Sequence, residues 1–246
     1  MDAILYTAGR ANRLGDSLKE ANKILLRFDG RSLLERHVEH LAALRVSRLY
    51  VVTGHGRKAV AAEFSQLRVR HGVEILELFN PDFKEGSVLS MAVSLPILKR
   101  MQEVLLMDGD VLYGEEMLRR LVESPHRTAL LVDRGYSTAD DDPVLVPMRA
   151  GKPFDFVKRW NGKADSIGES VGLFKVGIEE LPMLIEETEV RTTGPGRTAS
   201  YDDVLRALVQ AGRFEAEDIT GMPWTEIDFP GDIEHARTVV LPALKP

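Results

Sequence analysis

Short apolar runs alternate with amphipathic segments of helical spacing along the first half of the chain, and this alternation restricts the fold more than any other feature. The predicted strands cover 3–6, 24–28, 48–54, 73–76, 103–107 and 128–132, and the predicted helices cover 32–44, 57–68, 87–99 and 114–123. Repeated strand–helix units are typical of a largely parallel sheet with helices on both faces. We therefore expect an α/β fold, a three-layer α/β/α sandwich that binds ligands at the carboxyl ends of its strands.

The rhythm changes between about 133 and 177. Short apolar stretches at 144–146, 154–157 and 171–176 are joined by polar turns, with no long helix between them. We interpret this segment as a β-rich insertion packed on the parallel core. A helix is expected at 201–211, then a strand near 225–227 and a last helix from about Asp232. We find no internal repeat, so one domain spanning 1–246 is preferred to two.

The composition excludes several classes of protein. The 246 residues include 32 Lys and Arg against 38 Asp and Glu, and this net charge of −6 argues against a nucleic-acid-binding surface. The chain has no cysteine, which excludes disulfides, thiolate zinc sites and a cysteine nucleophile. It shows no signal peptide, and no apolar run approaches the roughly 18 residues of a membrane-spanning helix. We expect a cytoplasmic protein with neither nucleic acid nor membrane as a partner.

The turn after the first predicted strand combines small and basic residues. Small residues let backbone N–H groups approach a polyphosphate, and Arg13 and Lys23 would neutralise phosphate oxygens. The alternative is a small-residue turn with two solvated cations. The turn is neither a Walker A motif nor Gly-x-Gly-x-x-Gly, because Ala11 stands at the second glycine position. The residues that we expect to contact a triphosphate here are Thr7, Ala8, Gly9, Arg10 and Asn12.

Carboxylates follow two of the predicted strands. Asp108 and Asp110 flank a glycine at the end of an apolar strand, a pattern that suits a hard divalent cation such as Mg²⁺, although an ordinary Asp-Gly-Asp turn is the alternative. Glu226 and Asp228 project from one face of a strand because side chains alternate with period two. We take Asp228 as the better candidate for a second metal ligand. Asp232 is interpreted as the N-cap of the last helix.

The order of these motifs resembles the MobA-like and sugar-phosphate nucleotidyltransferases, and most of all the small cytidylyltransferases that act on phosphocholine, aminoethylphosphonate or inositol 1-phosphate. The resemblance runs nearly end to end and depends on order and spacing, since each motif is weak alone. Three further stretches, 80–92, 168–174 and 201–205, resemble the family's base and ribose segment, acceptor strand and acidic helix start. The residues that carry the first motifs are Ala8, Gly9, Arg13, Leu14, Lys23, Asp108, Gly109, Asp110, Trp224, Glu226, Ile227 and Asp228.

The resemblance implies a Rossmann-like (GT-A-like) sheet, with 1–132 as the nucleotide-binding half and 133–246 as the half that binds the acceptor and completes the metal site. It implies an Mg²⁺-dependent enzyme that joins an NTP, with CTP expected, to a small phosphate or phosphonate acceptor and releases pyrophosphate. Arg13, Lys23 and Lys158 are the expected catalytic cations, although a solvated lysine is the alternative for Lys158. The other implied assignments are nucleotide contacts by Asn80, Gly86, Ser87, Ser90 and Asp108, metal ligands Asp110 and Asp228, and acceptor contacts by Glu169, Tyr201, Asp202 and Trp160.

Three departures from the family pattern concern the nucleotide side: Ala11 replaces a usual glycine, Asn22 a usual proline, and Tyr6-Thr7 a usual aliphatic-Ala pair. The closest alternative is a sugar-1-phosphate or molybdopterin nucleotidyltransferase that uses another NTP. A catalytically silent nucleotide-binding regulatory domain is a further alternative, and Ala11 disfavours a dinucleotide-binding oxidoreductase. His37 is interpreted as a packing or surface residue. The sequence leaves the acceptor and the oligomeric state open.

Overall fold

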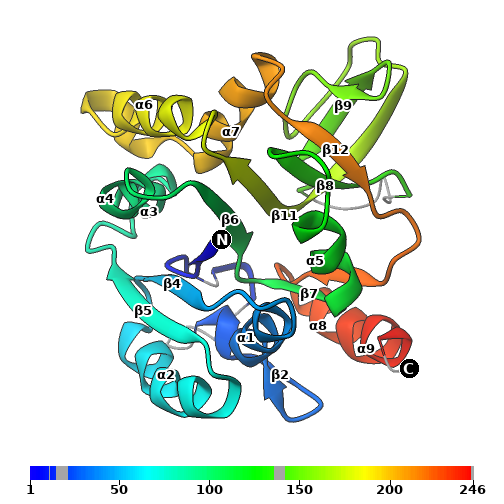
Figure 1. Ribbon diagram of the computed structural model, residues 1–246. Coiled ribbons are helices and arrows are strands. Elements are labelled where there is room, and N and C mark those ends of the chain that lie inside the picture. Colours follow the sequence, from blue (N-terminus) through cyan, green and yellow to red (C-terminus); the bar gives the residue numbers. More distant parts are fainter. Residues whose placement is uncertain (11, 15–21, 136–141, 245–246) are drawn as a thin grey trace.

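The structure is a computed structural model and describes residues 1–10, 12–14, 22–135 and 142–244. A sheet of nine strands forms the centre of this part of the chain (Figure 1). Its path is β10–β9–β11–β6–β1–β4–β5, with β8 paired to β11 and β12 paired to β8. These strands are β1 (Asp2–Tyr6), β4 (Arg48–Thr53), β5 (Glu74–Phe79), β6 (Glu103–Asp108), β8 (Ala129–Asp133), β9 (Leu145–Arg149), β10 (Lys152–Pro153), β11 (Ser166–Gly177) and β12 (Glu215–Asp218). Two small ribbons pair β2 (Arg27–Phe28) with β3 (Arg31–Ser32), and β7 (Val111–Tyr113) with β13 (Trp224–Glu226).

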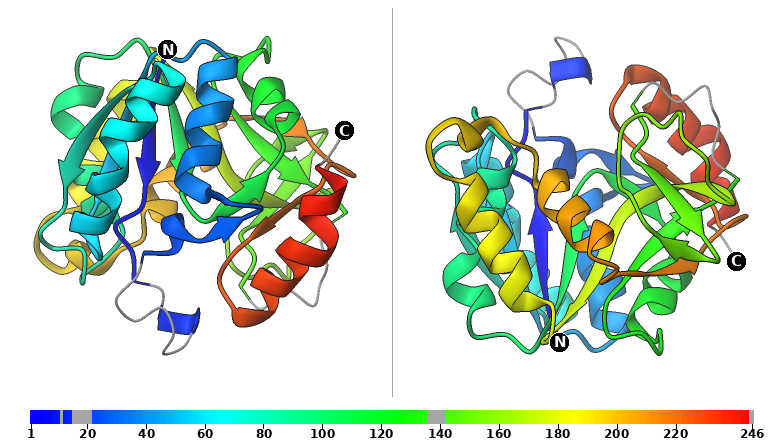
Figure 2. Two further views of the ribbon diagram at one scale, coloured as in Figure 1. Left: turned by 90° about the horizontal axis from the view of Figure 1, so that it is seen from below. Right: turned by 90° about the horizontal axis from the view of Figure 1, so that it is seen from above.

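Helices cover both faces of the sheet (Figure 2). The longer ones are α1 (Leu33–Ala43), α2 (Arg57–His71), α5 (Glu115–Val122), α6 (Leu181–Arg191) and α7 (Tyr201–Gln210). Shorter helical pieces are η1 (Asn12–Leu14), η3 (Lys23–Leu25), α3 (Val88–Ala92), α4 (Leu95–Leu98), η4 (Gly194–Thr198), α8 (Pro230–His235), η5 (Ala236–Val240) and α9 (Leu241–Ala243). None of the helices in the described ranges is long and apolar enough to cross a membrane.

Alternation along the central strands divides the core into two layers. In β1, Ala3 and Leu5 pack in the hydrophobic cluster with α1, α2 and α5, whereas Ile4 belongs to the cluster with α3, α6 and α7. This is the period-two geometry of a strand that is buried on both faces. β1 pairs in parallel with β4 and β6, and β4 pairs in parallel with β5. The expected three-layer α/β/α sandwich with a mostly parallel sheet is confirmed.

The β-rich segment after β8 extends the central sheet instead of packing on its face. β11 runs antiparallel to β6, β8 and β9, and its hydrogen bonds to β6 join the two predicted halves of the chain. Strands form here as predicted, but β11 is long, at 12 residues, and the segment continues the sheet rather than packing on the core. Their edge-to-edge pairing satisfies backbone groups that would otherwise be left without partners. The expected strand at 154–157 is reduced to one bridge between Val157 and Leu145.

Two other predicted elements are broken by local chemistry. The apolar run 24–28 does not form a buried strand: Asn22 caps the short η3, and only Arg27–Phe28 pairs, in a hairpin with β3. The amphipathic segment 87–99 is divided into α3 and α4. Pro96, at the start of α4, has no N–H to continue the hydrogen bonds of α3, so the chain turns at this point.

Candidate active site

A cavity of about 310 Å³ opens at the carboxyl ends of β1 and β6, where ligands were expected. It lies between the strand ends, the β7–β13 ribbon and the start of α7. The sequence-predicted residues that line it are Ala8, Gly9, Arg13, Ser87, Ser90, Asp108, Asp110, Lys158, Tyr201, Asp202 and Asp228. Residues that are more than 200 positions apart in the chain therefore share one site.

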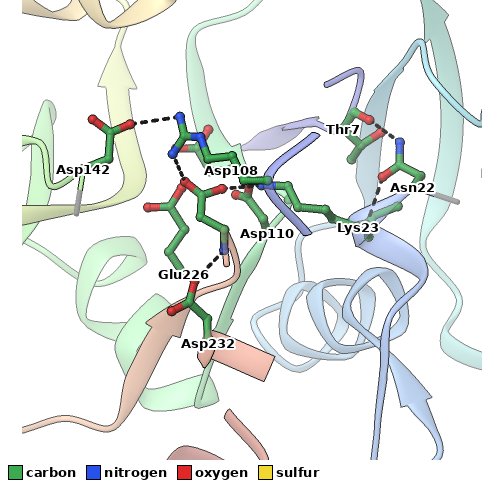
Figure 3. Close-up of polar contacts among 12 residues, drawn as sticks. Thr7, Asn22, Lys23, Asp108, Asp110, Asp142, Glu226 and Asp232 are labelled. Atoms are coloured by element: carbon green, nitrogen blue, oxygen red, sulfur yellow. Dashed lines mark hydrogen bonds and ion pairs between the residues drawn. The ribbon is translucent and has the colours of Figure 1, made fainter. Parts of the chain in front are cut away.

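Three carboxylates converge at one side of this cavity. Ligand oxygens of Asp110, Glu226 and Asp228 all lie within 4.8 Å of one another. The pairing of β13 with β7 sets Glu226 opposite Val111, and the N–H of Ile227 donates to the carbonyl of Asp110 at 2.9 Å. These backbone bonds fix the two acidic segments side by side, so that a hard cation would find three oxygen donors (Figure 3).

The electrostatics of the three carboxylates differ. Glu226 is exposed, but desolvation of its carboxylate in the cavity raises its pKa. The negative charges of Asp110 and Asp228 raise this pKa further. Burial would raise the pKa of Asp228, but Lys23 and Arg13 outweigh this effect and the pKa is lowered. Crowded carboxylates of this kind need a compensating cation, because like charges disfavour each other's ionised form.

Asp232 supports this arrangement from the next turn. The helix α8 begins at Pro230, so Asp232 is its third residue and not its N-cap, which corrects the sequence interpretation. Its carboxylate accepts from the backbone N–H groups of Asp228 and Phe229 at 2.7 and 2.6 Å. A carboxylate at this position satisfies the N–H of the N-cap residue Phe229 and of the residue before it, and thereby fixes the backbone of Asp228.

Lys23 provides the compensating charge. Its ammonium lies 2.5 Å from an oxygen of Asp110 and 2.6 Å from an oxygen of Asp228 (Figure 3). Burial lowers the pKa of Lys23, but the two carboxylates more than offset this, and the net shift is upward. Lys23 is thus a charged lysine held at the position where the acidic residues converge.

Two further cations join a chain of ion pairs beside Lys23. Arg13 donates to Asp228 at 2.9 Å and to Asp142 at 3.0 Å, and the ammonium of Lys158 lies 3.2 Å from the same Asp142 carboxylate. Both cationic side chains are about half exposed, at 48%. Ion pairs with this exposure contribute at most about 1 kcal/mol each. An anionic ligand that entered the cavity would therefore compete readily for Arg13 and Lys158.

Asn22, which stands at the family's usual proline position, ties the first turn to Lys23. Its amide donates to the carbonyls of Thr7 and His55, at 2.5 and 2.9 Å, and its oxygen accepts from the N–H of Ile24 at 3.0 Å. A proline side chain offers none of these hydrogen bonds. Asn22 therefore holds the start of η3, and with it Lys23, against the end of β1.

Asp108 is not part of the three-carboxylate group and bonds instead to Tyr201 of α7. The hydroxyl of Tyr201 donates to the Asp108 carboxylate, and the Tyr201 ring stacks on Tyr6 with centroids 5.5 Å apart. Burial and the nearby Asp110 raise the pKa of Asp108. This contact anchors the start of α7 to the end of β6, two residues before Asp110.

Gly172 of β11 makes room for Asp108. Its φ is +71°, and a Cβ there would lie 2.3 Å from an oxygen of Asp108. We expect Gly172→Ala to lower the Tm by at least twice as much as Gly212→Ala. Gly212 has a similar φ of +69°, but its Cβ would meet nothing within 4 Å, so that variant isolates the backbone cost of about 1–2 kcal/mol. Equal Tm values for the two variants, measured by thermal unfolding, would contradict close packing at Gly172.

The nucleotide-side residues that line the cavity come from the first turn and from α3. Ser87 also contacts the start of α7, because its hydroxyl oxygen accepts from the N–H of Tyr201 at 3.0 Å. Ala8 accepts from the N–H of His55 at 3.0 Å, and Gly9 is exposed with open space around it. The side chain of Asn12, together with Ala11, lies outside the described residues.

The other predicted nucleotide contacts do not line the cavity. Thr7 is buried and donates to the carbonyl of Val52 at 2.8 Å, and Asn80 is buried and donates to Ser90 at 3.1 Å. Gly86 lies against the backbone of 197–199. Arg10 is exposed, with its guanidinium 6.0 Å from the centre of the Phe83 ring. Of these residues, Asn80 supports the cavity through Ser90, which lines it, whereas Arg10 lies at the surface.

The predicted acceptor residues are divided in the same way. Tyr201, Asp202 and Lys158 line the cavity, whereas Glu169 and Trp160 do not. Glu169 is buried within β11, opposite Asp133 of β8. The ring of Trp160 packs edge-on against Phe154, with centroids 5.4 Å apart.

Sequence reasoning missed Asp142 and gave too little weight to Glu226. Alternation from Asp228 would have indicated Glu226, since both side chains lie on one face of the same segment. Asp142 belongs to an acidic stretch in a polar loop, and its two cationic partners lie at least 16 positions away. No local pattern connects these three residues.

Comparison with known proteins identifies the family of the chain. The chain matches the model of the MobA-like NTP transferase domain over residues 3–171. It belongs to that family, which confirms the predicted resemblance and the nucleotidyltransferase class.

Individual relatives are more distant. The chain is 29% identical over 257 residues to CMP-5'-(3-aminopropyl)phosphonate synthase of Streptomyces rubellomurinus, and covers 38% of that protein with 95% of its own length. It is 28% identical over 235 residues to the bifunctional IPC transferase and DIPP synthase of Rubrobacter xylanophilus, with 92% of this chain and 50% of the relative covered. The chain thus spans half or less of the length of these two relatives. The structure of the inositol-1-phosphate CTP transferase from T. maritima has a TM-score of 0.75 at 22% identity, covering 94% of this chain and 90% of that one, and supports the fold.

Proposed function

We propose that the protein is a cytidylyltransferase that joins CTP to a small phosphate- or phosphonate-bearing acceptor with release of pyrophosphate. The observation that carries the proposal is the convergence of three carboxylates with Arg13 and Lys158 in one cavity at the strand ends, with Lys23 paired to two of those carboxylates. The names of the similar proteins favour CTP over other nucleotides. The alternative, a catalytically silent nucleotide-binding domain, does not account for this group of carboxylates and cations.

Asp110, Glu226 and Asp228 are the residues that would hold Mg²⁺. Their donor set fits the ion, because Mg²⁺ prefers carboxylate oxygens and completes its coordination with phosphate oxygens and water. When bound, the ion supplies charge neutralisation at the phosphates and orients the reacting groups.

The basic residues would act on the triphosphate and the acceptor. In the proposed reaction an acceptor oxygen forms a bond to the α-phosphorus of CTP, the bond between that phosphorus and the bridging oxygen to the β-phosphate breaks, and pyrophosphate leaves. Lys23 and Arg13 would exchange their carboxylate partners for triphosphate oxygens, and Lys158 would hold the acceptor phosphate. The acceptor is already anionic at neutral pH, so no general base is needed.

The far side of the cavity favours an acceptor with a cationic end. Asp202 and Tyr201 line the cavity, and so do the aromatic residues Phe156 and Phe174. An ammonium group could pair with the carboxylate and lie against an aromatic face. We therefore propose an amino- or trimethylammonium-bearing phosphate or phosphonate as the acceptor class.

The decisive experiment is a matrix of CTP, UTP, GTP and ATP against phosphocholine, aminoethylphosphonate, inositol 1-phosphate and glucose 1-phosphate, with pyrophosphate release as the readout. We expect turnover with CTP and, among acceptors, preference for the two cationic compounds over inositol 1-phosphate. Turnover with UTP or GTP well above CTP would refute the base assignment. Preference for inositol 1-phosphate or glucose 1-phosphate, which carry no cationic group, would refute the cationic end alone.

A further inference from the structure

His37 is buried, at 1% exposure, and the proposed reaction does not use it directly. It belongs to α1, and its ring contacts that of Tyr113 in β7. Its Nε2 is 3.3 Å from the carbonyl oxygen of Gly109, and its Nδ1 is 3.0 Å from the hydroxyl of Tyr113. A carbonyl oxygen only accepts, so Nε2 carries the hydrogen and Nδ1 accepts from Tyr113.

These two contacts hold both ends of the segment that carries the acidic group. Gly109 immediately precedes Asp110, and Tyr113 ends β7, which pairs with the strand of Glu226. Asp228 is tied to the same segment, since the N–H of the preceding Ile227 bonds to the carbonyl of Asp110. Hydrogen bonds from one imidazole therefore reach the backbone that sets the spacing of all three carboxylates.

We propose that His37 is a positioning residue of the divalent-cation site, one that sets the convergence of the three carboxylates through Gly109 and Tyr113. This inference rests on the proposed function, because it concerns the same cation. Burial lowers the pKa of His37 to about 4, which agrees with a neutral ring whose two nitrogens serve as one donor and one acceptor. Residues that orient ligands in this way typically contribute about 10- to 100-fold to metal affinity.

His40 provides a matched control on the same helix. It is also largely buried, and its ring lies 5.0 Å from the ring of Tyr113, so it shares the helix, the neighbour and the residue type. Its Nδ1 has no hydrogen-bond partner among the described residues. His40 contacts Tyr113 only through its ring and has no hydrogen bond to Gly109.

The test is binding of Mn²⁺ alone, measured by calorimetry without nucleotide, for the wild type, His37→Leu, His37→Gln and His40→Leu. We expect His37→Leu to weaken Mn²⁺ binding by about 10-fold or more, His40→Leu to stay within about twofold, and His37→Gln to recover most of the affinity because its amide can donate to Gly109. Wild-type affinity in His37→Leu, or an equal loss in His40→Leu, would overturn the proposal.

Two additions keep the test decisive. If His37→Leu does not fold, Tyr113→Phe, which removes only the hydroxyl that bonds to Nδ1, is expected to weaken Mn²⁺ binding, and unchanged Mn²⁺ affinity in that variant would equally overturn the proposal. Pyrophosphate release by the wild type tests the reaction separately. A protein that binds Mn²⁺ but turns over no nucleotide would contradict the proposed function, while the comparison of His37 with His40 would still decide the role of His37.

Discussion

Asp110→Asn is expected to reduce the rate of pyrophosphate release by about a hundred- to a thousandfold. Asparagine keeps the size of the side chain and one oxygen, but it removes the charge that attracts both Lys23 and a divalent cation. Asp110 follows the end of β6 by two residues and is one of the three carboxylates that would hold the cation. The measurement is turnover at saturating CTP and Mg²⁺, with Mn²⁺ affinity as a second readout.

Glu189→Gln is the matched control for this substitution. Glu189 is half exposed and pairs with Lys99 at 2.7 Å, so the change removes one negative charge on α6 without touching the cavity. Its turnover should stay within about twofold of the parent, since exposed ion pairs contribute little. Parental turnover and Mn²⁺ affinity in Asp110→Asn would instead show that the acidic group holds no catalytic cation.

The architecture could be predicted from the sequence wherever local pattern and global packing agree. Apolar runs such as 3–6 and 103–107 are buried on both faces in the structure, and their continuous hydrophobicity is what a central parallel strand requires. The run at 24–28 has a similar composition but is not a buried strand. There the hydrogen bonds of the Asn22 side chain favour a short 3₁₀ turn over a strand. The pattern of apolar residues does not reveal when side-chain hydrogen bonds compete with sheet formation in this way.

The site was predictable to the extent that it depends on strand ends. Asp110 and Lys158 were expected to face a ligand, and both line the cavity. The contacts made by Asp142 and His37 were not predictable, because they join segments 129 and 72 positions apart through side-chain geometry. His37 was interpreted as packing from its helical position, and burial is correct, but its hydrogen bonds depend on where the sheet places Gly109.

Lys23→Met is expected to affect Mn²⁺ binding and CTP turnover differently. The ammonium of Lys23 lies between Asp110 and Asp228, where a cation would bind, so it competes with that cation until a triphosphate draws it away. Without the ammonium the crowded carboxylates repel one another, and we expect Mn²⁺ binding without nucleotide to be unchanged or tighter. Turnover of CTP should nevertheless fall by at least about a hundredfold, because the charge that stabilises the triphosphate is lost.

Lys99→Met removes the same charge from the exposed pair with Glu189, and it should alter neither Mn²⁺ affinity nor turnover by more than about twofold. A purely structural role for Lys23 predicts another result, since a distorted site would lose Mn²⁺ affinity and turnover together. Parallel losses in Lys23→Met would therefore contradict the exchange of partners. Opposite changes would mean that Lys23 and the cation occupy the carboxylates in turn. Triphosphate binding would then strengthen cation binding, because it draws Lys23 away. Cation binding would strengthen triphosphate binding by the same factor.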